Sequence, residues 1–161
     1  MTNPLLAEWN TPFGLPPFDQ VSDDDYMPAV AAALEQSRAN IAAIADDPAE
    51  PDFTNTIEAL ELADETLGRV LSAFYSVAGA DSNPAREALQ REFAPMLSAY
   101  SSEVSENKAL FARVKAVWDN RDAMDLTDEQ QRVLMLTHRG FVRSGAQLEG
   151  PAAEKLRVAK S

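Results

Sequence analysis

Cysteine is absent from the 161 residues, histidine occurs once, and glycine occurs only six times. Without cysteine the chain has no disulfides, thiolate metal ligands or thiol nucleophile. No run approaches the roughly 20 apolar residues of a membrane span. The N-terminus carries Glu8 where a signal peptide would place basic residues before an apolar run. These absences predict a soluble, cytoplasmic protein without thiol redox chemistry.

Basic residues are also few, with 14 Lys and Arg against 26 Asp and Glu and a formal net charge of −12. Such a chain repels phosphate backbones and anionic lipid headgroups. We therefore expect neither nucleic acid nor a membrane as a partner. The excess acidic residues are typical of solubilising helix faces.

The remaining composition favours helices. Hydrophobic residues make up 45% of the chain, and no stretch alternates apolar and polar residues over the length of a strand. The length supports one hydrophobic core. We predict an all-α fold, an antiparallel bundle of about five to six helices preceded by an extended N-terminal arm.

The predicted arm covers residues 1–21. It is rich in proline, which prevents a continuous helix, but it also holds Trp9, Phe13 and Phe18. A disordered tail usually has fewer apolar residues. We expect an ordered arm that is pinned to the surface by its aromatic side chains.

Start and stop signals divide the remainder, residues 22–161, into helices. The helices begin at capping residues and end at proline or glycine. The expected helices run from near Asp23 to Asp46, from Thr54 and Asn55 to about Gly79, from Asn83 and Pro84 through Val104 with a kink at Pro95, from Asn107 through Trp118, from Thr127 with Gln130 to Ser144 and Gly145, and from Ala152 to Lys160.

The sequence stops inside the last of these helical patterns. Natural domains seldom end there without a stop signal. We therefore predict that residues 1–161 form a single helical N-terminal domain and that Ser161 interrupts a longer chain.

The sequence predicts no catalytic, cofactor-binding or metal-ligating residue. A helical zinc site of the His-Glu-x-x-His kind needs two histidines, and this chain has only His138. Leu134 and Phe141 lie about one turn on either side of it, which favours a structural histidine with one satisfied nitrogen. No Gly-x-Ser-x-Gly elbow or phosphate-binding glycine loop is present. Acidic pairs such as Glu58 and Glu61 are interpreted as solvated faces.

Three aromatic residues leave two interpretations open. Phe74, Tyr75 and Tyr100 would suit the lining of a peptide channel, but aromatics at helical spacing more often belong to a core.

Several segments, in order, resemble a known family. They are Asn3-Pro4-Leu5-Leu6, Leu15-Pro16-Pro17-Phe18, Asp25-Tyr26-Met27-Pro28-Ala29, Pro51 to Glu61, Leu110 to Val114 with Ala116-Val117-Trp118, and Arg139 to Ala146. Together they resemble the N-terminal region of the thimet-oligopeptidase type (M3 family) of zinc metallopeptidases, and within it the bacterial peptidyl-dipeptidases, over essentially the whole chain. None of these segments is a catalytic signature.

The resemblance implies a parent enzyme several times longer, in which this helical region walls or gates a substrate channel. Zinc would be held by a His-Glu-x-x-His motif and a downstream Glu, both outside this sequence, so the parent carries zinc and this region carries none. The implied partners are the missing C-terminal catalytic domain of the same chain and short peptide substrates, with release of C-terminal dipeptides. A free-standing helical interaction module is the alternative.

Overall fold

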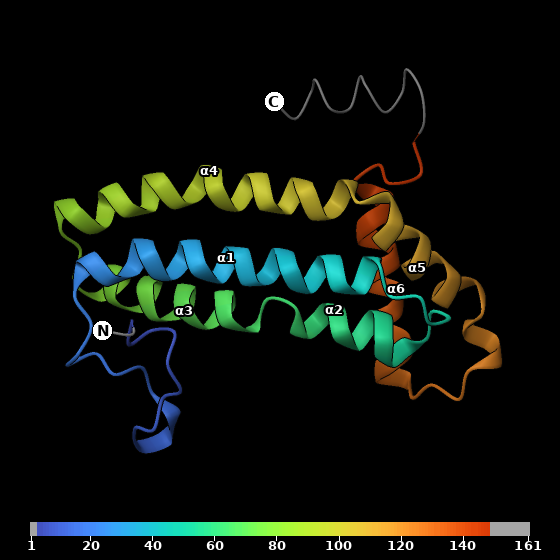
Figure 1. Ribbon diagram of the computed structural model, residues 1–161, viewed down its shortest axis with the longest axis horizontal. Coiled ribbons are helices and arrows are strands. Elements are labelled where there is room, and N and C mark those ends of the chain that lie inside the picture. The colour runs from blue at the N-terminus through green and yellow to red at the C-terminus, as the bar shows by residue number, and fades with distance from the viewer. Residues whose placement is uncertain (1–2, 149–161) are drawn as a thin grey trace. The chain divides into compact units, whose positions relative to one another are not determined.

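The computed structural model describes residues 3–148, and all regular secondary structure within them is helical (Figure 1). The all-α prediction is confirmed. Two compact units divide the chain. Unit 1 is made of Met1–Asn40 and Leu62–Tyr100, and unit 2 of Ile41–Glu61 and Ser101–Ser161. Within the described range, none of the helices combines the length and apolar character needed to cross a membrane.

Unit 1 is built on α1 (Asp23–Ala45, up to Asn40), α3 (Glu65–Ala80) and α4 (Pro84–Glu106, up to Tyr100). Tyr26, near the start of α1, contacts Phe74 in the later part of α3. Asn40, much further along α1, donates to the Ala63 carbonyl at 2.9 Å, just before α3 begins. Helices α1 and α3 are therefore antiparallel, as the sequence predicts for neighbouring helices.

The core of unit 1 is centred on Phe74, which is fully buried. Its ring lies edge-on to Tyr26 at 5.0 Å and to Phe93 of α4 at 4.9 Å between centroids. Such edge-to-face pairs add to the free energy of burying apolar area. One aromatic cluster thus holds three helices together.

The N-terminal arm is ordered and belongs to unit 1. Leu5 is completely buried, the Asn3 amide donates to the Asp25 carbonyl at 2.8 Å, and the Arg69 guanidinium lies 4.8 Å from the centre of the Trp9 ring. Trp9 therefore pins the arm as predicted. The same prediction is wrong for Phe13 and Phe18, which are 97% and 45% exposed. Phe13 lies in η1, a short 3₁₀ turn (Pro12–Gly14).

Unit 2 combines η2, a π-helical turn (Phe53–Glu58), with α5 (Lys108–Asp119), η3 (Arg121–Ala123) and α6 (Asp128–Arg143). Helix α5 packs against both α6 and η2. Its buried face is mostly apolar. That face consists of Leu110, Phe111, Arg113, Val114 and Val117.

The prediction of a second helix, capped by Thr54 and Asn55 and continuous to about Gly79, is wrong in two respects. Its cap is Asp52, whose carboxylate accepts from the Asn55 N–H at 2.7 Å while the Asn55 side chain accepts from the Asp52 N–H. The helix is also broken at Ala63 and Asp64, between α2 (Ala59–Leu62) and α3. The break persists because Asn40 and the Tyr100 hydroxyl, from two other helices, satisfy polar groups there.

The predicted helix starts near Asp23, at Asn83 and Pro84, at Asn107 and at Thr127 are confirmed. Asn83 and Asn107 accept from backbone N–H groups three residues on, both at 2.9 Å. Thr127 and Gln130 form the expected capping box. Gly145 follows α6 with a φ of 91°, the conformation that glycine adopts readily.

Three predictions of the sequence analysis remain predictions. Helix α4 continues through Pro95, and the expected kink there stays untested. The helix expected from Ala152 to Lys160 lies outside the described residues. That residues 1–161 form one N-terminal domain of a longer protein is likewise an expectation.

Candidate functional site

An aromatic stack joins side chains of α5 and α6 in unit 2. The His138 ring of α6 lies parallel to Trp118 of α5, with centroids 4.8 Å apart and 4° between the planes. Phe111 lies on the other side at 6.1 Å, and Phe141 is 5.8 Å from Phe111. The Arg121 guanidinium covers Trp118 at 4.3 Å.

The stack explains the state of His138. Burial lowers the pKa of the imidazole, and the nearby positive charges of Lys115 and Arg121 lower it further against the opposing effect of Asp119. The imidazole is therefore neutral near pH 7. The sequence predicts a histidine with one hydrogen-bonded nitrogen. In the structure, no described residue forms a hydrogen bond with either ring nitrogen, and the ring is instead held by stacking. The structural interpretation of His138 fits this geometry.

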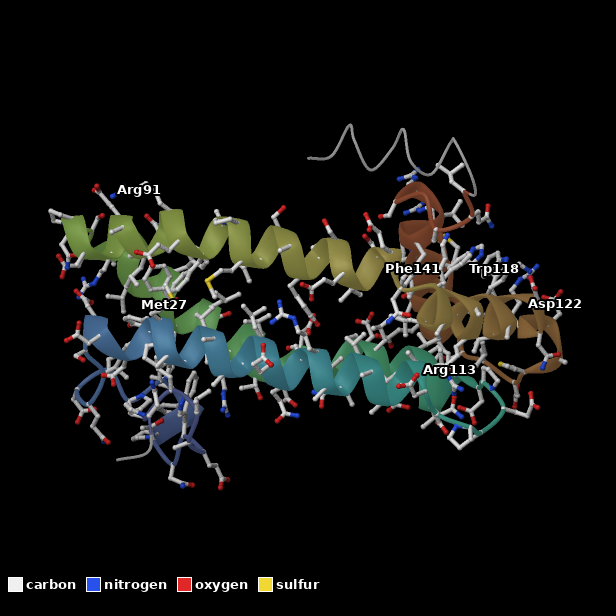
Figure 2. All side chains as sticks on the ribbon, turned by 45° about the horizontal axis from the view of Figure 1, so that its top comes forward. Met27, Arg91, Arg113, Trp118, Asp122 and Phe141 are labelled. Carbon is white, nitrogen blue, oxygen red and sulfur yellow. The ribbon has the colours of Figure 1, made fainter. Side chains whose placement is uncertain are left out.

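A pocket of about 440 Å³ opens beside the stack. Its apolar lining residues include Trp118 and Leu134, and its polar lining residues include Arg121 and Gln131. Met124, from the connection between α5 and α6, also lines the pocket. Figure 2 labels Trp118 near the end of α5 and Asp122 in η3, both of which line the pocket. None of the described residues that line this pocket is a nucleophile with an adjacent base.

A buried arginine of α5, labelled in Figure 2, holds a second group of contacts in unit 2. Arg113 is 6% exposed and donates to the carbonyls of Asp47 and Ala49 at 2.7 and 3.0 Å, and to the Asn55 side chain at 2.9 Å. It therefore fixes the connection between α1 and η2 against α5. Its Nε is buried without a partner among the described residues.

Unit 1 has a shallow groove of about 460 Å³ between α1 and α4. Small side chains create it, since Ala31, Ala32 and Ala99 leave space beside Leu34 and Met96. Arg38 borders the groove and lies 5.8 Å from the Tyr100 ring centre.

The aromatic candidates for a channel lining divide clearly. Phe74 is fully buried, and Tyr100 is 5% exposed with its hydroxyl donating to Asp64 at 2.5 Å. Both are core residues of unit 1. Burial and the hydrogen bond to the Asp64 carboxylate raise the pKa of Tyr100 well above its ordinary value. Tyr75, at 43% exposed, is the member of the three that can face a partner.

Comparison with known proteins decides the relationship, although no family model matches. Dipeptidyl carboxypeptidase of Salmonella typhimurium is 41% identical over 157 residues, which is 98% of this chain and 23% of that protein. Oligopeptidase A of Escherichia coli is 30% identical over 145 residues, 90% of this chain and 21% of that protein. The chain is thus similar, over nearly its whole length, to the N-terminal region of peptidases of the M3 family.

A third relative extends the family match to plants. The probable cytosolic oligopeptidase A of Arabidopsis thaliana is 25% identical over 154 residues, or 96% of this chain and 21% of that protein. The chain thus spans between a fifth and a quarter of the length of these M3 relatives, in their N-terminal region. Because the match covers nearly the whole chain, both units fall within it.

In residues 3–148, no group of three or more His, Asp or Glu side chains is arranged to hold a metal ion. The His138 ring stacks with Trp118 and Phe111.

Proposed function

We propose that this chain is the N-terminal helical domain of a zinc-dependent peptidase that hydrolyses short peptides, and that it walls or gates the substrate channel without containing the catalytic site. The observation that supports this most is the 41% identity to a dipeptidyl carboxypeptidase across 98% of the chain. Such identity extends through both units and is not limited to a short motif.

The proposed parent activity is release of C-terminal dipeptides. The Salmonella dipeptidyl carboxypeptidase shares 41% of the aligned residues and the Escherichia coli oligopeptidase A shares 30%. The higher value favours peptidyl-dipeptidase over general oligopeptidase action. Zinc and its ligands are assigned to the region beyond this chain, whose single histidine cannot make a pair of imidazole ligands.

Rigid helical units suit the role of a wall or gate. The aromatic core holds the helices of unit 1 together, and the hydrogen bonds of Arg113 to Asp47, Ala49 and Asn55, here called the Arg113 clamp, hold unit 2 together. A channel with rigid walls excludes folded proteins by size and admits short, unstructured peptides. The proposed partners are the catalytic domain of the same polypeptide and its peptide substrates.

The proposed location is the cytoplasm, in keeping with the name of the cytosolic plant relative. The net charge of −12 gives no basis for binding nucleic acid or an anionic membrane.

The test compares this 161-residue chain with the longer reading frame that contains it. Both are supplied with zinc and a short peptide, and dipeptide release is followed by mass spectrometry. Zinc-dependent release by the longer protein alone is the expected result. Activity in the 161-residue chain would contradict the proposal, and a longer protein without peptidase activity would favour the interaction-module alternative.

A further inference from the structure

The N-terminal arm is anchored at one end and presents an apolar turn at the other. Leu5 is fully buried, whereas Phe13, Leu15 and Phe18 are 97%, 56% and 45% exposed. The short coil of η1, which carries Phe13, stands apart from α1 and α3 in Figure 1. A ring that is almost fully exposed gains nothing from the burial that stabilises the rest of unit 1.

This turn has a defined shape. The Gly14 N–H donates to the Thr11 carbonyl at 3.0 Å, the Leu15 N–H donates to the Pro12 carbonyl at 3.4 Å, and the Thr11 hydroxyl donates to the Leu15 carbonyl. Phe13 therefore projects from a hydrogen-bonded loop and not from an irregular tail.

Phe13 itself is in an unfavourable backbone conformation. Its φ of 62° lies in the left-handed region, which bulky side chains avoid and which glycine and asparagine tolerate. None of the residues described here covers its ring. Strain at an exposed position persists where another function requires it.

We propose that residues 11–18 dock on the part of the peptidase that this chain does not include, with Phe13 inserted into an apolar pocket there. This inference rests on the proposed function. The chain matches 23% of the length of its dipeptidyl carboxypeptidase relative, so most of such an enzyme is available to supply the pocket.

The size of the patch favours a partner in the same polypeptide. Phe13, Leu15 and Phe18 together expose the equivalent of roughly two whole side chains, or about 400 Å². A stable interface between separate chains buries about 800 Å² on each partner. A covalent connection raises the effective concentration and makes a small patch sufficient. A second copy of this chain is therefore the weaker occupant.

The first experiment measures exposure of the Phe13 ring by hydroxyl-radical footprinting in the 161-residue chain and in the longer protein. Oxidation at Phe13 should fall by roughly tenfold in the longer protein, because a docked anchor is excluded from solvent. Dipeptide release is assayed in the same sample. An active peptidase in which Phe13 reacts equally fast in both proteins would overturn the docking proposal while leaving the proposed function intact.

The second experiment uses Phe13→Asn, which removes the ring but suits the left-handed conformation. It should leave the melting temperature of the 161-residue chain unchanged or slightly raised, and lower that of the longer protein by about 2–4 °C. The matched control is Leu62→Gln, since Leu62 is 59% exposed and lies outside the arm. Equal effects of the two variants in the longer protein would contradict the proposal. So would protection of Phe13 that grows with concentration of the 161-residue chain, which indicates self-association.

Discussion

Unit 1 and unit 2 achieve compactness by different means. In unit 1, Phe74 joins three helices through edge-to-face contacts with Tyr26 and Phe93. In unit 2, a buried arginine satisfies the carbonyls of a connection that has no regular structure of its own. The apolar core is stabilised by burial and ring contacts, whereas the Arg113 contacts depend on hydrogen bonds to the carbonyls of the connection. The stability of unit 1 should therefore depend most on the volume of its buried side chains, and that of unit 2 on the hydrogen-bond donors of Arg113.

The largest expected effect is in the core of unit 1. Phe74→Ala removes a fully buried ring and should lower the free energy of unfolding by about 3–5 kcal/mol, because the loss combines transfer and cavity terms. Urea denaturation followed by circular dichroism measures it. Tyr75→Ala, next in sequence and 43% exposed, is the control and should cost far less. Similar costs for both variants would show that Phe74 is not the centre of the core.

The clamp of unit 2 should give the next largest effect. Arg113→Met keeps much of the length and apolar contact of the side chain but removes all donors to Asp47, Ala49 and Asn55. We expect a loss of about 2–4 kcal/mol, because buried acceptors lose their partners. Lys115→Met on the same helix removes an exposed ion pair with Asp119 and should cost under about 1 kcal/mol. If Arg113→Met left the free energy of unfolding nearly unchanged, water would have to supply the hydrogen bonds that the arginine gives to these acceptors.

The hydrogen bond between Tyr100 and Asp64 should contribute less. Tyr100→Phe should destabilise by about 1–2 kcal/mol, since the Asp64 carboxylate loses a partner. The pKa of Tyr100 is raised in the folded state. Tyr100 therefore contributes its full share to the free energy of unfolding below the ordinary tyrosine pKa near 10, and this share is lost as the pH rises toward the pKa of the folded state. The unfolding free energy of the unmodified chain should thus fall at strongly alkaline pH. A steeper fall in the Phe variant would contradict this assignment.

The smallest expected effect involves His138. Its folded pKa is lowered by burial, so its stability contribution is complete above the ordinary value near 6.5 and is lost as the pH falls through the lower folded value. His138→Phe keeps a flat ring against Trp118 and removes the titration. The decrease in urea midpoint between pH 7.5 and pH 5, measured at constant ionic strength, should be smaller in this variant. An unchanged decrease would assign the acid sensitivity to other groups.

Sequence reasoning located the helix starts because capping is local. Asn83, Asn107 and Thr127 each bond to backbone groups three residues away, and such short patterns carry their own structural information. It failed at Asp52, where an aspartate and an asparagine replace the more familiar serine or threonine with glutamate. The π-helical turn that follows has no comparable local signature.

The candidate site was less accessible to sequence reasoning. His138 was placed near the buried stripe, but its parallel stacking with Trp118 depends on how α5 and α6 pack. Arg113 was not singled out, although a charged residue among Leu110, Phe111, Val114 and Val117 is a signal that sequence alone provides. Its acceptors, more than 50 residues away in the chain, were not predictable.

The amino-acid sequence by itself determined the helical class and most helix boundaries, because composition, caps and periodic apolar residues act over a few residues at a time. The resemblance to M3 peptidases was likewise contained in the sequence. Only the tertiary structure decided that Trp9 is anchored while Phe13 is exposed at a strained φ, that Asn40 and Tyr100 stabilise the break before α3, and that Arg113 fixes a distant connection. These features depend on contacts between residues far apart in the chain, and the free energy of such contacts is set by packing and desolvation, which no local pattern encodes.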